Sequence, residues 1–527
     1  MLQHLSIKHN VTLESSSSTQ STPNPITSLW QQRSNKEAME RFEYNLIRWI
    51  VADDMAFSSI ESPFFQQMIN DIPGISMPFT SRNTLTSRIA AQFELDRQQL
   101  VKELATSCQT IAVSLDGWTS NNDVSILGVI GHWLTEDFEY KEALLEYAEI
   151  EGPKSGENMG AIVLQLLDEL DLERKLLSIT ADNASNNETL IDEVETGLRE
   201  QFLHTESSNA LRFRGQDSYI RCLAHVLNLI VKEILKTLKL GDRKLAEESV
   251  ELILQHQYIN TTDSALARLR VLAIWLLRTP ERKSQWRNLC THNNLEDNLI
   301  PYDVDNRWNS TYLMINAGIR ARRQISRWIS SHSEMPQFTD GDWEFLQQLS
   351  TILQRFYEHT EHVSRSAPQI SYAVPIYYDL HNLINNAANR EGEFQTLDKD
   401  IAAAVGSALG KYSKYYDLID GLDIYYIALI LNPRYKTRLL EQELGDEASN
   451  LIIQNIKEVL HQEYPPIISS SQIPSSSQFL RQSLEARLLS KIQPSTSLIS
   501  DIDRYFNDPL AQIPEESAKD PNWLFNW

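Results

Sequence analysis

The sequence predicts an α/β fold in which a mixed β-sheet is interrupted by a large all-α insertion and preceded by a small helical domain. Three strand patterns in a row are followed by alternating helical and strand patterns, an order typical of a sheet with both parallel and antiparallel strands. A stretch from about residue 249 to residue 432 has helical periodicity with few strand signals. Residues 30–105, ahead of the strands, are also helical in pattern.

Composition and charge narrow the classes of function. The chain has 527 residues, of which 42% are hydrophobic, and its formal net charge is -23. An evenly acidic surface would repel DNA, but arginines gather between residues 261 and 327 and could line a strand-binding groove. A solvated helical face is the competing interpretation of these arginines. No window approaches about 18 uninterrupted apolar residues, so no membrane partner is expected. The three cysteines form no close pair, which excludes a disulfide framework.

The first hundred residues divide into a linker and a helical domain. Residues 1–29 become rich in serine, threonine and proline from residue 10 onward and predict a flexible linker. In the helical domain over residues 30–105, Phe42, Leu46 and Ile50 recur at a spacing that places them on one helical face. Ser81 is expected to be the N-cap of a further helix.

The expected α/β core occupies residues 106–240. Its strand patterns are short aliphatic or alternating runs, and helical patterns lie between the later ones. The order is three meander strands and then helix, strand, helix, strand, which resembles that of the ribonuclease H-like fold. The predicted elements are strands at 110–115, 125–134 and 140–150, a helix at 158–170, a strand at 176–181, a helix at 188–202, a strand at 219–222 and a helix at 223–236.

Two of these strands end in an aspartate. Asp116 closes an apolar run that begins at residue 111, and Asp182 closes another that begins at residue 176. Ligands of α/β sheets gather at the carboxyl ends of the strands, so the two carboxylates share one edge of the sheet if their strands are neighbours. Paired carboxylates repel each other unless a cation lies between them. The pattern therefore predicts a Mg²⁺ or Mn²⁺ site suited to phosphoryl chemistry.

Four motifs occur in an order and at spacings similar to those of hAT-superfamily DNA transposases. Any one of them alone would be a weak signal, whereas the four together are highly specific. The resemblance covers the chain from about Trp30 to Trp527. The motifs are Asp116–Ser120 (DGWTS), Asp182–Asn187 (DNASNN), Arg221–Leu229 (RCLAHVLNL) and Asp305–Tyr312 (DNRWNSTY), with a weaker match at Leu431–Lys436 (LNPRYK).

The resemblance implies a DDE-type transposase, in which a ribonuclease H-like core is split by a helical insertion, here residues 241–420. Two aspartates and one glutamate hold two Mg²⁺ ions in such enzymes, which cut DNA and join the freed end to a target. Asp116 and Asp182 match the first two of these acids.

Other matched positions are implied to contact DNA or to support the site. Trp118 and Trp308, the latter preceded by Arg307, match aromatic positions near the flanking hairpin, where an indole can stack on a displaced base. Burial in the core is the competing interpretation for a tryptophan. Cys222 and His225 match a Cys-x2-His motif, for which packing and hydrogen bonding around the active site are favoured over zinc binding because no partner ligand lies nearby in the sequence.

Both ends of the sequence depart from the superfamily pattern. The third acid, a glutamate, is expected in a C-terminal helix downstream of a tryptophan-rich stretch like the one at residues 522–527, so residues 421–527 are expected to lack it. Much of the region through which the superfamily assembles into oligomers would be lacking as well. His4 and His9 resemble the second half of a BED-type zinc finger, and Zn²⁺ is expected only if the missing half of that finger is present.

Two interpretations follow from the sequence. In the first, the protein is an active transposase whose missing parts reflect an imperfect gene model. In the second, it is a transposase-derived DNA-binding protein that folds but is catalytically incomplete, and a non-enzymatic DNA-binding or protein-interaction module is the alternative that follows from it. The sequence as written favours the second interpretation. DNA is the expected partner and the nucleus the expected location in each case.

Overall fold

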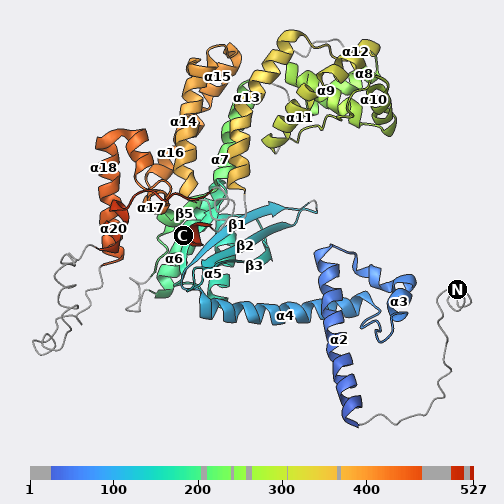
Figure 1. Ribbon diagram of the computed structural model, residues 1–527, viewed down its shortest axis with the longest axis vertical. Coiled ribbons are helices and arrows are strands. Elements are labelled where there is room, and N and C mark those ends of the chain that lie inside the picture. The colour runs from blue at the N-terminus through green and yellow to red at the C-terminus, as the bar shows by residue number, and fades with distance from the viewer. Residues whose placement is uncertain are drawn as a thin grey trace, which may run out of the picture. The chain divides into compact units, whose positions relative to one another are not determined.

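The computed structural model describes residues 25–120, 122–202, 211–238, 243–256, 264–304, 307–364, 370–465, 500–514 and 523–526 (Figure 1). The chain divides into two compact units with a boundary after Ser107. The predicted fold class is confirmed, because a five-stranded mixed sheet is combined with a large helical region. In the described part of the chain, no helix is both long enough and apolar enough to cross a membrane.

The first unit is made of helices. Helix α2 spans Pro25–Ala52, η1 spans Phe57–Glu61, α3 spans Pro63–Asn70 and α4 spans Arg82–Ser107. Helix α2 begins at Pro25, inside the segment that was expected to be a linker. Proline is tolerated in the first turn of a helix because its missing N–H would have no partner there. Ser81 Oγ accepts a hydrogen bond from the backbone N–H of Thr84 at 3.3 Å, as expected ahead of α4.

The second unit is built on the sheet. Strand β1 pairs antiparallel with β2 and parallel with β4, so the meander of the first three strands is joined to the two later strands along β1. Strand β2 pairs antiparallel with β3, and β4 pairs parallel with β5. The strand order is therefore β3-β2-β1-β4-β5. The strands are β1 (Ile111–Thr119), β2 (Ser125–Leu134), β3 (Tyr140–Glu149), β4 (Leu176–Ala181) and β5 (Tyr219–Arg221).

The two faces of the sheet differ in polarity. On β1, Ile111, Val113 and Leu115 alternate with less buried residues, so they line the apolar face of the strand. The opposite face carries Ser114 and Asp116, and it is the face that bears the candidate site. Helices α5 (Gly156–Glu169) and α6 (Ser185–Phe202), which flank β4 in sequence, pack closely against each other.

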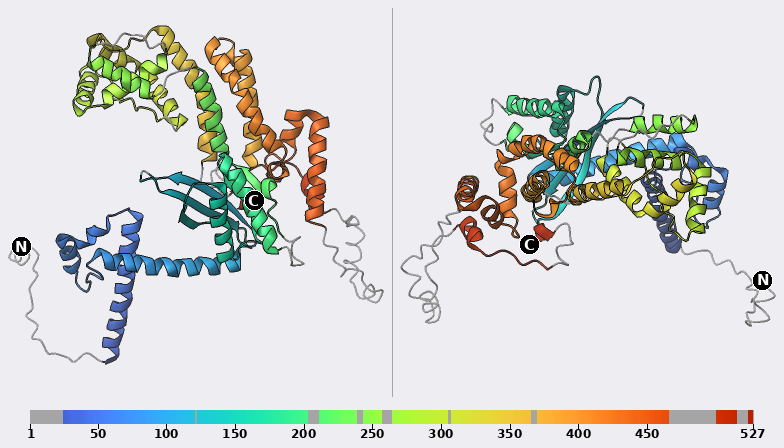
Figure 2. Two further views of the ribbon diagram at one scale, coloured as in Figure 1. Left: turned by 180° about the vertical axis from the view of Figure 1, so that it is seen from behind. Right: turned by 90° about the horizontal axis from the view of Figure 1, so that it is seen from above.

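A large helical region follows β5. Helices α7 and α13 run side by side away from the sheet (Figure 2). Their apolar faces join one continuous core with the helices around them. The helices are α7 (Leu223–Thr237), α8 (Arg243–Leu254), α9 (Ala265–Leu277), α10 (Pro280–His292), α11 (Trp308–Arg320), α12 (Arg322–Ser331), α13 (Asp340–Val363), η4 (Ile370–Tyr372), α14 (Ala373–Asn389), η5 (Gly392–Phe394), α15 (Lys399–Ser407), α16 (Leu409–Asp420), α17 (Asp423–Leu431), α18 (Arg438–Glu463), α20 (Asp501–Asn507) and α21 (Trp523–Asn526), with η3 (Gly215–Ser218) ahead of β5.

A buried lysine joins the end of the chain to this helical region. Lys436, in the motif at residues 431–436, donates from Nζ to the carbonyl of Tyr505 at 2.7 Å and to that of Asp508 at 2.8 Å. In the same motif the fully buried Asn432 donates to Ser371 Oγ at 3.1 Å. Two of the polar positions of this weaker motif are therefore explained by structural hydrogen bonds.

Candidate metal and DNA site

The structure places Asp116 and Asp182 on neighbouring parallel strands. The parallel register pairs Ser114 of β1 with Thr180 of β4, and each aspartate lies two residues beyond this pair. Asp182 directly follows Ala181, the last residue of β4, but the expectation that the first strand ends at Asp116 is wrong, because β1 stays paired with β2 as far as Thr119. Side chains two residues apart on a strand share a face, so both carboxylates lie on the face of Ser114 and Thr180, just beyond the last pair between β1 and β4. The thiol of Cys222, just after the adjacent strand β5, is within electrostatic range of both carboxylates.

Local hydrogen bonds orient Asp182 on its strand end. Its Oδ1 accepts from the backbone N–H of Ala184 at 3.0 Å and from Asn187 Nδ2 at 2.5 Å. The first of these bonds is the local turn that aspartate favours, and it prepares the start of α6. The backbone carbonyl of Asp182 also accepts from Asn187 and from the Tyr219 hydroxyl. Oδ2 makes no hydrogen bond or ion pair with the described residues, so one oxygen of this half-buried carboxylate stays open to a ligand.

Asp116 is exposed, and a lysine contacts the residue that follows it. Lys154 donates from Nζ to the backbone carbonyl of Gly117, the residue that follows Asp116. The carbonyl of Lys154 in turn accepts from Asn186 Nδ2 at 3.4 Å, which links this loop to the start of α6. Lys154 occupies the space into which a Cβ on Gly117 would point, so it lies on the face of β1 opposite to Asp116.

Cys222 joins β5 to α7, and His225 lies in the first turn of α7. Burial raises the pKa of the Cys222 thiol, the carboxylates of Asp182 and Asp116 raise it further, and the backbone N–H groups of His225 and Ala224 lower it. Cys222 is the N-cap residue of α7 and makes no side-chain capping bond. Within the residues that the structure describes, no cluster of three or more His, Cys, Asp or Glu side chains could hold a metal ion.

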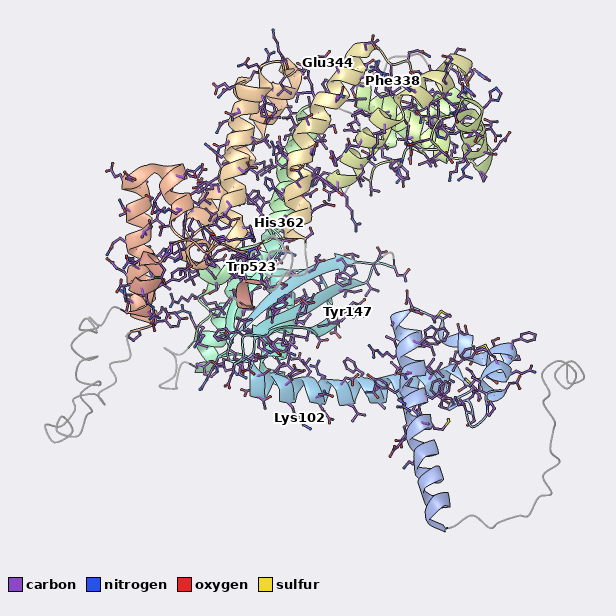
Figure 3. All side chains as sticks on the ribbon, viewed as in Figure 1. Lys102, Tyr147, Phe338, Glu344, His362 and Trp523 are labelled. Atoms are coloured by element: carbon purple, nitrogen blue, oxygen red, sulfur yellow. The ribbon has the colours of Figure 1, made fainter. Side chains whose placement is uncertain are left out.

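Two aromatic side chains form an exposed platform on the same sheet. Trp118, two residues past Asp116, is 39% exposed, and Tyr147 of β3 is 57% exposed (Figure 3). Their ring centroids are 5.7 Å apart and the rings are tilted by 58°. Gly128 of β2 lies opposite Asp116, and an added Cβ there would come within 3.3 Å of the Trp118 ring. The absence of a side chain at residue 128 thus leaves room for the indole.

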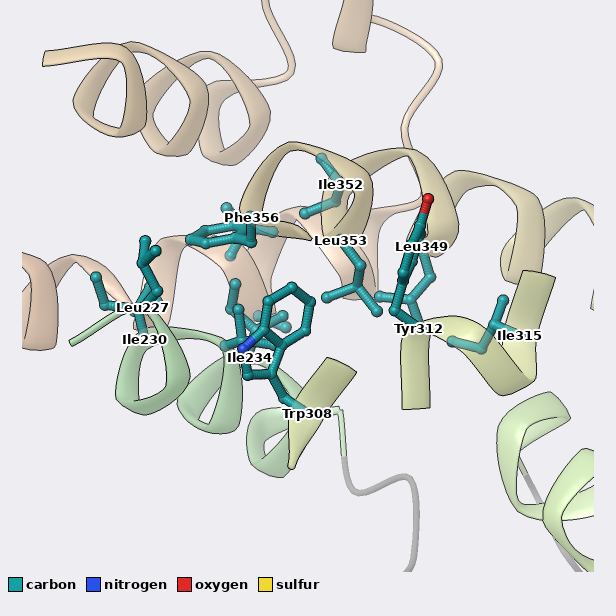
Figure 4. Close-up of a cluster of buried hydrophobic side chains, with 14 of the residues drawn as sticks. Leu227, Ile230, Ile234, Trp308, Tyr312, Ile315, Leu349, Ile352, Leu353 and Phe356 are labelled. Carbon is teal, nitrogen blue, oxygen red and sulfur yellow. The ribbon is translucent and has the colours of Figure 1, made fainter. Parts of the chain in front are cut away.

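Trp308 has a different environment. It is 3% exposed and lies among Leu227, Leu353 and Phe356 in the helical core (Figure 4). Its ring packs edge-on against Phe356 with the centroids 6.5 Å apart. This burial favours the packing role over the base-stacking role that the resemblance implies. Arg307 is exposed at the N-terminus of α11, and His4 and His9 lie outside the described residues.

Five arginines of the arginine-rich stretch form ion pairs within the second unit. Their partners come from other helices and loops, which the local charge count could not reveal. The stretch therefore offers less free positive charge to a DNA strand than its composition indicates. The pairs are Arg268 with Asp342, Arg270 with Asp303, Arg278 with Glu251, Arg287 with Asp297 and Arg322 with Asp340.

Comparisons with known proteins match the regions that build this site. The family model described as the ZBED1 RNase-like domain matches residues 114–209, and the one described as the ZBED1 RNase-like helical domain matches residues 220–352. The first match contains both aspartates.

Individual relatives support the same family assignment. The "Putative AC transposase" of Zea mays is 22% identical over 402 residues, which are 74% of this chain and 44% of that protein. "Zinc finger BED domain-containing protein RICESLEEPER 2" of Oryza sativa is 20% identical over 431 residues, 80% of this chain and 54% of that protein. The chain is a hAT-family, transposase-derived protein.

A fungal relative is named as a regulator and not as a transposase. The "Putative transcriptional regulator tpeD" of Talaromyces stipitatus is 26% identical over 415 residues, which are 76% of this hAT-family chain and 44% of that protein. The chain thus spans about half the length of the curated relatives it matches.

Proposed function

We propose that this hAT-family chain binds DNA in the nucleus where the pairing of β1 with β4 ends, with a Mg²⁺ or Mn²⁺ ion held between Asp116 and Asp182. One observation carries the proposal: the parallel register of β1 and β4 brings two carboxylates to the same edge and the same face of the sheet. Carboxylates in such an arrangement repel each other, and a divalent cation relieves the repulsion.

The donor set fits a hard divalent cation. Carboxylate oxygens are the ligands that Mg²⁺ prefers, and Mg²⁺ commonly keeps several waters while one or two carboxylates bind it. Within the described part of the chain, Asp182 has one carboxylate oxygen without a hydrogen bond, and the Asp116 side chain makes no hydrogen bond or ion pair. A bound ion would supply positive charge for a DNA phosphate. Asn187 would hold the Asp182 carboxylate in place for the ion.

The surroundings provide contacts for the rest of a nucleotide. The platform of Trp118 and Tyr147, on the same face as Asp116, can stack on an unpaired base. Stacking of a base on an aromatic ring contributes to binding with little dependence on sequence. We therefore expect the site to favour hairpin or frayed DNA ends over a continuous duplex.

We further propose that the polypeptide of residues 1–527 binds DNA without cutting it. The superfamily chemistry requires a third acid, and none of the described residues joins the two aspartates to form a group of three ligands. Loss of one metal-binding carboxylate is expected to lower the rate of cleavage by several orders of magnitude, because metal chemistry depends on charge and geometry together. A role in regulation or in protein interaction is the alternative, and the fungal relative with a regulator's name favours it.

A DNA-binding assay with two readouts tests both proposals. Fluorescence anisotropy of a labelled hairpin would report affinity with Mg²⁺ and with a chelator, and gel electrophoresis of the same samples would report cleavage. We expect the chelator to weaken binding by wild type, with no cleavage in any sample. The double variant Asp116→Asn, Asp182→Asn should bind equally in both conditions.

Asp123→Asn is the matched control. Asp123 is an exposed carboxylate in the turn after β1, with a positive φ of 59° that asparagine adopts as readily. It should behave like wild type. Binding by wild type that ignores the chelator would refute the metal-assisted site, and Mg²⁺-dependent cleavage abolished by Asp182→Asn would refute the lack of catalysis.

A further inference from the structure

A cavity of about 520 Å³ opens on the sheet face that carries the two aspartates, nearer the start of the strands. Its sheet wall includes Ser114 of β1 together with Ser178 and Thr180 of β4. Its other wall is mainly apolar and includes Leu223 at the start of α7 and Ala373 at the start of α14. The volume lies in the range of sites that enclose small organic ligands.

The sheet wall contains hydroxyl groups without partners. Ser178 is 6% exposed, and its side chain makes no hydrogen bond in the described part of the chain. The Thr180 hydroxyl, two residues further along β4 on the same face, also has none among the described residues. A buried hydroxyl that gives up water without gaining a partner costs free energy. Both groups are therefore available to a ligand that carries its own donors and acceptors.

A chain of hydrogen bonds determines whether the third hydroxyl, that of Ser114, donates or accepts. Tyr140 donates to the Glu142 carboxylate at 3.0 Å, so its oxygen accepts from His132 Nδ1, which lies 2.8 Å away. With its proton on Nδ1, His132 presents Nε2 as an acceptor to the Ser114 hydroxyl at 2.9 Å. The proton of Ser114 is thus committed to His132, and Ser114 offers only lone pairs to the cavity.

The charged groups at the cavity wall are already paired. The Glu142 carboxylate accepts from Tyr140, and Arg221 pairs with Glu188 at 3.0 Å. Burial lowers the pKa of His132, although Glu142 opposes this effect, so the ring stays neutral at pH 7. The cavity therefore has one edge of neutral hydroxyl donors and acceptors opposite an apolar wall. This pattern suits a flat, uncharged ligand with polar edges and apolar faces.

We propose that this cavity receives the purine or pyrimidine base of a single unpaired nucleotide, with its polar edge against Ser178, Thr180 and Ser114. A nucleobase combines donors and acceptors on one edge with apolar faces, and its size suits the cavity. The idea that DNA delivers the base rests on the proposed function, because Ser114 and Thr180 lie two residues before Asp116 and Asp182 on the same strands. A phosphate held at the aspartates would leave its base close to the cavity.

Two probes test this inference with the full chain. The first is free 2-aminopurine deoxyriboside, whose fluorescence anisotropy reports binding to the cavity without any DNA. The second is a hairpin with one unpaired 2-aminopurine. Its fluorescence should rise when the base leaves the stack for the cavity, and it should stay quenched if the base stacks on Trp118 instead.

The matched variants remove hydroxyls without adding bulk. Ser178→Ala with Thr180→Val should weaken nucleoside binding about tenfold and reduce the fluorescence rise, because two hydrogen bonds to the base are lost. The thermal midpoint should stay equal or increase slightly, since these hydroxyls have no protein partner to lose. Ser125→Ala, which removes a hydroxyl of β2 outside the cavity, should leave all three readouts unchanged.

Four outcomes separate this inference from the proposed function. Nucleoside binding that the double variant weakens supports the base site, whether or not the unmodified hairpin binds. Failure of the unmodified hairpin to bind would count against the proposed function alone. No binding of the nucleoside, or equal binding by the double variant, overturns the base site and leaves only water in the cavity. A hairpin that binds while its 2-aminopurine stays quenched also overturns it.

Discussion

At the scale of single residues, the candidate site depends on the groups that hold Asp182 in place. Its carboxylate accepts from a backbone N–H two residues later and from the buried side chain of Asn187. The same amide also bonds the Asp182 carbonyl at 3.0 Å, so one side chain fixes both the acid and its backbone. The DNASNN motif thus has a structural role in addition to the one that the resemblance implies.

Replacing this amide should affect both stability and metal affinity. We expect Asn187→Ala to lower the free energy of unfolding by about 1 to 3 kcal/mol, because hydrogen bonds of a buried group are lost and an acceptor is left unpaired. Mg²⁺ affinity should fall as well, by about 10-fold to 100-fold, as for other residues that orient a metal ligand. Urea unfolding and metal titration would measure the two effects.

Asn186→Ala is the control for this prediction. Asn186 is an adjacent asparagine whose amide makes one longer bond of 3.4 Å to the Lys154 carbonyl. Its replacement should change stability by less than about 0.5 kcal/mol. Equal losses in the two variants would show that Asn187 does not orient Asp182 selectively.

At the scale of elements, ion pairs differ in value according to burial. Arg270 of α9 pairs with Asp303 at 2.7 Å, with side-chain exposures of 8% and 4%. Thr311 of α11 adds a hydrogen bond of 2.9 Å to the same carboxylate. These contacts tie α9, the segment before α11 and α11 itself into one cluster. The pair between Arg278 and Glu251 is similar in length at 2.7 Å but is 39% and 52% exposed.

Breaking the two pairs should have unequal effects. Asp303→Asn leaves a buried guanidinium without its counter-charge and should lower the free energy of unfolding by about 3 to 5 kcal/mol. Glu251→Gln should cost about 0 to 1 kcal/mol, since water screens the exposed pair. Urea denaturation followed by tryptophan fluorescence would compare them. Similar midpoints for the two variants would contradict the role assigned to the buried pair.

At the scale of the whole molecule, the sheet could be predicted from the sequence because each strand carries its own signal. Aliphatic runs that end in Asp116 and Asp182 indicated both strands, and the pairing of β1 with β4 confirms that these strands are neighbours. The run did not show where β1 ends, because Asp116 to Thr119 are held in the sheet by pairing with β2. The base-stacking role expected for Trp308 was harder to judge, since a tryptophan motif looks the same whether its ring is exposed or buried.

Contacts between distant residues account for what the sequence could not predict. The arginine-rich stretch looked like free positive charge because the acids that neutralise it, such as Asp342 opposite Arg268, lie 74 residues away. Tyr147 approaches the site only through the pairing of β3 with β2 in the sheet. The cavity hydroxyls likewise come together across β1 and β4. None of these contacts has a local pattern that the sequence alone displays.

The most direct test of the central claim is Mn²⁺ binding to the full chain, measured by electron paramagnetic resonance. Free Mn²⁺ gives a sharp six-line signal that weakens when the ion binds. We predict one site that Mg²⁺ competes for, and we predict its loss in the double variant Asp116→Asn, Asp182→Asn but not in Asp123→Asn. Equal Mn²⁺ binding by wild type and the double variant, or no binding by wild type, would contradict a metal site between β1 and β4.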